Sequence, residues 1–256
     1  MRICLIGAGN LATQLGMALT EKGHQLVQVW SRTQKSAEEL ASKLKCSYVT
    51  DISLISSDAD IYIIAVVDTA IESVLSKRNW SDILVVHTAG STPMSILGPY
   101  CKNFGVFYPF QTFTINKKVD FDQVPVCIEA NSTHNLNVLK ELAQSISQNV
   151  KLLDSTQRQQ IHLAAVFACN FVNHLYKIGE ELLYEKGIGF EILKPLILET
   201  AAKIVEQSPV ASQTGPASRN DKITMDKHLV LLNNHPELKN IYKQFSDRII
   251  QTPKKL

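Results

Sequence analysis

Apolar residues in the first 150 positions fall into short runs separated by amphipathic stretches. Several runs are apolar at every position, which is typical of strands covered on both faces of a sheet. They predict strands at Arg2–Ile6, Leu26–Trp30, Ser47–Val49, Ile61–Val66, Leu84–His87, Gly105–Tyr108, Val126–Ile128 and Val150–Leu153. Helical spacing predicts helices at Asn10–Lys22, Lys35–Leu44 and Asn131–Gln148. This alternation indicates βαβ units and a parallel, doubly wound α/β sheet.

The pattern changes after Asp154, where helical spacing replaces strands for the rest of the chain. We therefore expect two domains, residues 1–154 and residues 155–256, the second all-helical. Its first helix should run from Ser155 to about Lys186, and it is apolar almost all round between Leu163 and Leu175. Such a helix must be buried on every side, and a small helical domain has little material for that. We expect a second subunit to cover part of it, which predicts a homodimer.

Composition narrows the class of protein. Lys and Arg total 26 against 24 Asp and Glu, so the chain has no excess of positive charge for nucleic acid. Five scattered cysteines form no C-x-x-C pair, which argues against a metal site or a disulfide framework and favours the reducing cytoplasm. A strand-like run from residue 3 leaves no room for a signal peptide, and no apolar stretch approaches the roughly 20 residues of a membrane span.

A glycine motif follows the first predicted strand immediately. Residues 7–12 read Gly-x-Gly-x-x-Ala and lead into the first helix. Gly7 permits a tight turn, Gly9 lets the backbone approach a pyrophosphate, and Ala12 lets the helix pack close to the strand. The free N–H groups of the helix start then favour phosphate. The cofactor-binding residues predicted here are Gly7, Ala8, Gly9, Asn10, Leu11 and Ala12.

The end of the second strand indicates which dinucleotide binds. A site for NAD usually places Asp or Glu there to bind the ribose 2′-hydroxyl. This chain has Ser31, Arg32 and Thr33 instead. Arg32 can pair with a 2′-phosphate and stack on adenine, while the two hydroxyl groups add donors. The pattern predicts NADP, unless Arg32 is a solvated surface arginine.

Other strand ends should complete the site, because ligands of doubly wound sheets bind at the carboxyl ends of the strands. Val66 and Val67 end the fourth strand and are predicted to line the nicotinamide-ribose pocket, although a buried strand end would look the same. The next two strands deliver residues 87–91, His-Thr-Ala-Gly-Ser, and residues 108–113, Tyr-Pro-Phe-Gln-Thr-Phe, to the same edge. Such neighbouring polar and aromatic clusters are typical of a substrate cleft.

These motifs, together with residues 214–221, Thr-Gly-Pro-Ala-Ser-Arg-Asn-Asp, resemble a family of NADP oxidoreductases that pair a Rossmann domain with a C-terminal helical domain of unknown function. The resemblance spans nearly the whole chain. More distantly, the chain is similar to pyrroline-5-carboxylate reductase, deazaflavin-dependent NADP reductase and the β-hydroxyacid dehydrogenases. These relatives imply a helical domain like that of 6-phosphogluconate dehydrogenase, dimerisation through it, and an active site between the domains.

The chain departs from these relatives at two places. Asn220 stands where the family pattern has glycine, and asparagine tolerates a positive φ better than most residues, so the turn can survive. The β-hydroxyacid dehydrogenases use a Lys and an Asn four residues later on the first interdomain helix. No Lys-x-x-x-Asn occurs between Asp154 and Asn173, which weakens the transfer of their lysine mechanism to this chain.

Candidate catalytic groups are His87, His162 and Asn170. On a uniform helix of about 100° per residue, His162, Asn170 and Asn173 share one face. They either hydrogen-bond other helices or face cofactor and substrate. Hydride transfer to a carbonyl or imine needs a proton donor near the reacting heteroatom. Histidine is the side chain that titrates closest to neutral pH, which favours His87 and His162 for this role.

Substrate-binding candidates are Tyr108, Gln111, Asn173, Arg219 and Asp221. Tyr108 is also a possible proton donor, and the last two could bind a substrate carboxylate or simply cap the neighbouring helix. The function predicted is NADP-dependent hydride transfer to or from a small keto acid, hydroxy acid or imine. A pyrroline-5-carboxylate-type imine reductase and a non-catalytic dinucleotide sensor stay open as alternatives.

Overall fold

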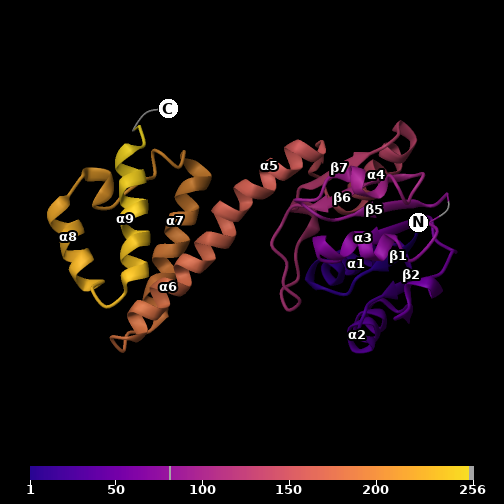
Figure 1. Ribbon diagram of the computed structural model, residues 1–256, viewed down its shortest axis with the longest axis horizontal. Helices are drawn as coiled ribbons and strands as arrows, with labels where there is room; N and C mark the ends of the chain where they lie inside the picture. The colour runs from indigo at the N-terminus through magenta and orange to yellow at the C-terminus, as the bar shows by residue number, and fades with distance from the viewer. Residues whose placement is uncertain (81, 254–256) are drawn as a thin grey trace. The chain divides into compact units, whose positions relative to one another are not determined.

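A computed structural model describes residues 1–80 and 82–253 of the chain (Figure 1). It forms two compact units, one over residues 1–174 and the other from Leu175 onward. The first unit therefore extends twenty residues beyond the boundary expected at Asp154, because side chains near the start of the following helix bond to the sheet unit. Across the described residues, no helix has both the length and the apolar character needed to span a membrane.

The first unit is built on an eight-stranded sheet of order β3-β2-β1-β4-β5-β6-β7-β8 (Figure 1). The strands are β1 (Arg2–Ile6), β2 (Gln25–Trp30), β3 (Ser47–Val49), β4 (Ile61–Ile64), β5 (Leu84–His87), β6 (Phe104–Pro109), β7 (Val126–Ala130) and β8 (Val150–Leu152). Every strand predicted from the sequence is present within two residues of its expected ends. The strand order reverses between β1 and β4, and ligands of doubly wound sheets bind at such a switch point.

One strand pairing differs from the expected parallel sheet. β7 runs antiparallel to β6, with Phe107 opposite Ile128. The chain between these strands contains only a short 3₁₀ turn, η4 (Phe121–Gln123), and parallel pairing of consecutive neighbours needs a longer crossover. A crossover helix follows β7, and β8 accordingly pairs with β7 in parallel.

Two layers cover the sheet, as alternating side chains on its strands require. Ile3 and Leu5 of β1 pack on one face with α1 (Asn10–Glu21), α2 (Gln34–Leu44) and α4 (Thr133–Ile146). Cys4 and Ile6 face the other layer. That layer contains α3 (Ile71–Leu75) and the 3₁₀ turns η1 (Ile52–Leu54), η2 (Asp68–Ala70) and η3 (Met94–Leu97). The doubly wound architecture predicted from the apolar runs is confirmed.

The long helix predicted from Ser155 is interrupted. It consists of α5 (Ser155–Ala165), a π-helical segment η5 (Val166–Phe171) and α6 (Val172–Tyr184). Its apolar middle is not covered within one chain, since Leu163 and Phe167 are more than half exposed. The expectation that a second subunit covers part of this helix stays a prediction.

The regular elements in the described part of the second unit are all helical. Its elements are the remainder of α6, η6 (Phe190–Leu193), α7 (Lys194–Glu206), η7 (Ala217–Arg219), α8 (Lys222–Leu231) and α9 (Pro236–Gln251). Only Ala217, Leu232 and Ser246 are buried among the described residues of this unit. The expected order of a Rossmann sheet followed by a helical domain is confirmed.

Candidate active site

The turn after β1 can be made only with glycine at its first position. Gly7 has φ of +123°, and a Cβ there would lie 2.1 Å from the carbonyl oxygen of Ala65, the residue after β4. An L side chain would therefore be strained and would collide with backbone. Gly7 brings the β1 turn against the β4 turn at the switch point of the sheet.

The start of α1 provides room and donors for an anion. Gly9 is the N-cap of α1, no side chain caps it, and nothing lies within 4 Å of where its Cβ would be. The first backbone N–H groups of a helix have no partner inside it, so they point into this open space. Ala12 is fully buried against the sheet, and the Asn10 side chain donates to the carbonyl of Phe113 at 3.0 Å. These residues fit a pyrophosphate group.

The segment after β2 lies beside this turn. The N–H of Gly7 donates to the carbonyl of Trp30 at 2.8 Å, which places Ser31, Arg32 and Thr33 next to the glycine motif. Arg32 is exposed and makes no ion pair or hydrogen bond with any residue that the structure describes. Thr33 donates to the Ser36 hydroxyl at 2.9 Å. A free guanidinium beside the dinucleotide turn fits a 2′-phosphate.

The end of β4 continues the same edge toward β5. Val66 is half-buried and Val67 is 65% exposed. The next residue, Asp68, accepts hydrogen bonds from the hydroxyl groups of Ser91 and Thr92, the second at 3.0 Å. The loop after β4 is thus bonded to the loop after β5.

A tyrosine and a histidine meet over the loop after β5. The hydroxyl of Tyr108, at the end of β6, lies 3.0 Å from Nδ1 of His162 on α5. A Cβ on Gly90 would come within 2.5 Å of His162 Nδ1 and 2.8 Å of the Tyr108 hydroxyl, so only glycine allows both rings this close. Burial raises the pKa of Tyr108 to about 12, so its phenol stays protonated at neutral pH. The predicted proximity of the two strand-end clusters is confirmed.

His87 lies on the same strand end but faces inward. Its side chain is fully buried, and its Nδ1 accepts from the N–H of Ala89 at 3.1 Å. Its Nε2 has no hydrogen-bond partner among the residues described. Burial, helped by the charge of Arg158, lowers the pKa of His87 to about 4, although the carbonyl of Pro93 opposes this shift. His87 is therefore neutral at pH 7, which makes it a weaker candidate for the proton donor.

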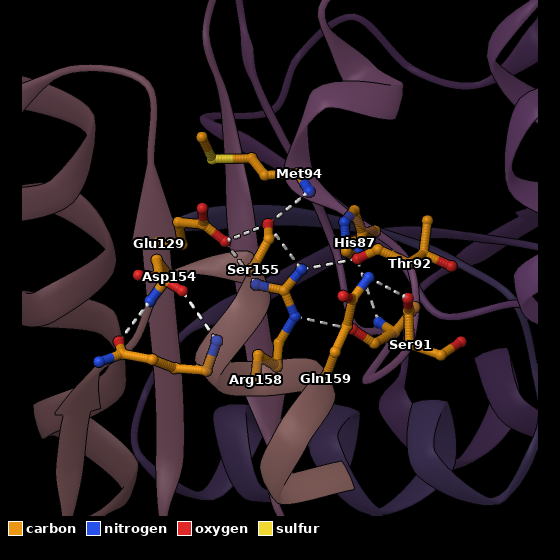
Figure 2. A network of polar contacts seen from close by, with 11 residues as sticks. His87, Ser91, Thr92, Met94, Glu129, Asp154, Ser155, Arg158 and Gln159 are labelled. Atoms are coloured by element: carbon orange, nitrogen blue, oxygen red, sulfur yellow. Dashed lines mark hydrogen bonds and ion pairs between the residues drawn. The ribbon is translucent and has the colours of Figure 1, made fainter. Parts of the chain in front are cut away.

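A buried ion pair beside this site was not identified from the sequence (Figure 2). Arg158 on α5 pairs with Glu129 of β7, Nη1 to Oε2 at 2.5 Å. Ser155 donates to the same carboxylate at 2.8 Å. The spacing of Arg158 and His162, one helical turn apart, places them on one face and could have indicated this role.

The other candidates on the long helix and after β6 are exposed. Gln111 accepts only from the N–H and hydroxyl of the adjacent Thr112. The side chains of Asn170 and Asn173 make no hydrogen bond to any described residue. The uniform 100° spacing that placed them with His162 does not hold, because the π-helical segment η5 has more residues per turn than an α-helix. Their roles stay predictions.

The remaining candidates belong to the second unit. Asn220 has φ of +53°, so asparagine does form the left-handed turn at the position where the family has glycine. Asp221 caps α8 by accepting from the N–H and the hydroxyl of Thr224, and these hydrogen bonds lower the pKa of its carboxyl group. Asp221 thus fulfils the capping alternative, whereas Arg219 is exposed and its role stays a prediction.

Comparison with protein families gives two matches that do not overlap, one toward each end of the chain. Residues 2–90 match the family model described as NADP oxidoreductase coenzyme F420-dependent. Residues 124–249 match a domain of unknown function, DUF2520. A comparison with curated proteins found no match.

Solved structures match almost the whole chain. A Bacteroides fragilis protein described as an NADP oxidoreductase is 43% identical, with 98% of both chains covered and a TM-score of 0.91. The reductive aminase of Aspergillus terreus, solved in complex with NADPH4, cyclohexanone and allyl amine, is 13% identical over 99% of this chain and 94% of its own, with a TM-score of 0.74. The 1-pyrroline-5-carboxylate reductase of Streptococcus pyogenes is 16% identical over 98% and 99%, with a TM-score of 0.64. The last two show a shared fold only.

Proposed function

Since this chain belongs to the family of NADP-dependent oxidoreductases in which a dinucleotide-binding domain precedes the DUF2520 domain, we propose that it transfers a hydride between nicotinamide and a small metabolite. The metabolite would carry a carbonyl or imine group, or the corresponding alcohol or amine. The observation that carries the proposal is the hydrogen bond between Tyr108 and His162 over Gly90, on the sheet edge that also holds the dinucleotide turn.

In this proposal the N-terminal turn and the segment after β2 bind the cofactor. The N–H groups at the start of α1 would hold the pyrophosphate, Arg32 would pair with the 2′-phosphate, and Val66 with Val67 would border the nicotinamide ribose. Bound NADPH would supply the hydride. The residues of this chain then have to bind the acceptor and deliver a proton to its heteroatom.

His162 is the proton donor that the geometry favours. In its protonated form His162 would donate from Nδ1 to the Tyr108 hydroxyl, which orients the ring and leaves Nε2–H for the substrate. Nε2 would then give its proton to the substrate heteroatom, and the neutral ring would take a proton back from solvent at Nε2. His87 already uses its Nδ1 as an acceptor inside the core, so it is the less suitable of the two histidines.

The function is tested by NADPH oxidation with a panel of keto acids and cyclic imines. Wild-type protein should turn over at least one of them, and His162→Gln should lower kcat by about 10²- to 10⁴-fold while the Kd for NADPH stays unchanged. A parallel binding titration with Arg32→Ala should weaken NADPH by about tenfold or more and leave NADH unaffected. NADPH binding without turnover of any substrate would favour the non-catalytic dinucleotide sensor. Equal losses of NADPH and NADH affinity in Arg32→Ala would reject the pairing of Arg32 with the 2′-phosphate.

We also infer that the protein is a homodimer. Four large apolar side chains of α7 are each more than half exposed: Leu196, Leu198, Ile204 and Val205. Exposed apolar area of this extent is typical of an interaction site, and a second copy of the chain supplies matching apolar surface. All five cysteines are free, which is consistent with our placing the protein in the cytoplasm.

A further inference from the structure

Arg158 is a charged residue held inside the first unit. Only 1% of its side chain is exposed. Burying a guanidinium costs several kcal/mol unless its charge is paired and its N–H groups are bonded. Here Glu129, itself mostly buried, pairs with Nη1, while Ser155 accepts from Nη2 at 3.2 Å and donates to the same Glu129 oxygen (Figure 2). The side chain is therefore held in one geometry.

The remaining N–H groups of Arg158 bind the loop after β5. Nε donates to the carbonyl of Ala89 at 3.2 Å, and Nη2 donates to the carbonyl of Thr92 at 2.6 Å. The adjacent Gln159 donates to the carbonyl of Ser91 at 2.8 Å. Figure 2 shows these side chains of α5 reaching the loop side by side. The carbonyl before Gly90 and the two carbonyls after it are thus bonded to one turn of α5.

The same helix presents His162 to this loop one turn further on. Gly90 lies so close to His162 and Tyr108 that a single Cβ would collide with both. A small shift of the loop relative to α5 would therefore push His162 away from Tyr108 or open a gap above Gly90. The hydrogen bonds of Arg158 and Gln159 span the space between this loop and the helix.

We propose that Arg158, held by Glu129, is a positioning residue that fixes the loop of residues 89–92 against α5 and so keeps His162 aligned with Tyr108. This inference rests on the proposed function for its catalytic consequence, but the alignment itself does not need turnover to be observed. Lysine at this position would keep the charge and lose the planar fork that binds two carbonyls and a carboxylate at once.

The test compares Arg158→Lys with Arg78→Lys. Arg78 is a matched control, because it also donates to a backbone carbonyl of the first unit, that of Ile55, and contacts Tyr62 away from the loop. Arg158→Lys should lower kcat by about ten- to a hundredfold with NADPH affinity within twofold of wild type, since a misplacement of about 1 Å can cost that much. Arg78→Lys should lower thermal stability without changing kcat.

A second readout is independent of turnover. Nitrogen-15 NMR of the imidazole rings, with the His162 signals assigned through His162→Gln, should show a changed Nδ1 shift in Arg158→Lys and the wild-type shift in Arg78→Lys. Should Arg158→Lys fail to fold, Glu129→Gln loosens the same guanidinium and replaces it in both measurements. Unaltered His162 signals would overturn the positioning role. Absence of turnover in wild type would instead reject the proposed function and leave the NMR comparison to decide this inference.

Discussion

The two units of the chain bury their apolar residues to very different extents. In the first unit, whole strands such as Ile61–Ile64 are inaccessible, and helices cover both faces of the sheet. In the described part of the second unit, only Ala217 and Leu232 are buried apolar residues. Each Å² of apolar surface that is removed from water on folding contributes about 25 cal/mol of stabilisation. Apolar surface that stays exposed contributes none. The sheet unit therefore buries its apolar residues within one chain, whereas the helical unit leaves exposed the apolar area that the proposed second copy would cover.

The largest expected effect comes from opening a cavity in the sheet unit. Leu15→Ala, at a fully buried position of α1, should lower the free energy of unfolding by about 2–5 kcal/mol. Urea unfolding followed by tryptophan fluorescence measures this unit alone, because Trp30 and Trp80, the two tryptophans of the chain, both lie in it. Leu54→Ala, 66% exposed, is the matched control and should change stability by less than about 0.5 kcal/mol. Equal costs at both positions would contradict a self-contained core.

The helical unit should respond instead to a charge placed among the exposed apolar side chains of α7. Leu198 is 70% exposed in a single chain, so Leu198→Asp would be nearly neutral there. If a second copy covers α7, the substitution removes about 2 kcal/mol of apolar burial from each copy, or about 4 kcal/mol per dimer, which weakens dimerisation by roughly a thousandfold. Sedimentation velocity over a concentration series measures the dimer Kd.

Leu54→Asp is the control for this experiment, because it adds the same charge at a similar exposure in the sheet unit. It should leave the association state of the protein unchanged. A monomeric wild-type protein, or a Leu198→Asp variant that dimerises as tightly as wild type, would show that α7 has another role.

How much the sequence could predict depends on whether the signal is local. Strands such as Ile61–Ile64 are identified by short apolar runs, and the turn at Gly7 is identified by its glycine motif directly after a strand. Both signals are local, so strand positions and the cofactor turn were predictable. The antiparallel β7 was not, since apolar runs carry no information on direction when a connection lacks a helix.

The polar part of the site was less predictable because it depends on which side chains meet in space. His87 and His162 look alike in sequence, yet one is buried with a lowered pKa and the other contacts Tyr108 over Gly90. Beyond its helical spacing to His162, Arg158 had no signal in the sequence, because Ala89 and Glu129, to which it bonds, are distant in the chain. The π-helical segment η5 likewise breaks the even spacing from which Asn170 was placed.

The smallest expected effect concerns His87, whose side chain is fully buried in the sheet unit. The folded-state pKa of His87 is about 4, below its unfolded value of 6.5, so the unfolded chain binds the extra proton between these pH values. Its contribution to stability is therefore present above about pH 6.5 and is lost as the pH falls toward 4. Between pH 7 and pH 5, wild type should lose on the order of 1–2 kcal/mol more than His87→Asn, measured by tryptophan fluorescence in urea at each pH. Parallel pH profiles for the two proteins would mean that His87 takes up its proton in the folded unit as easily as in the unfolded chain.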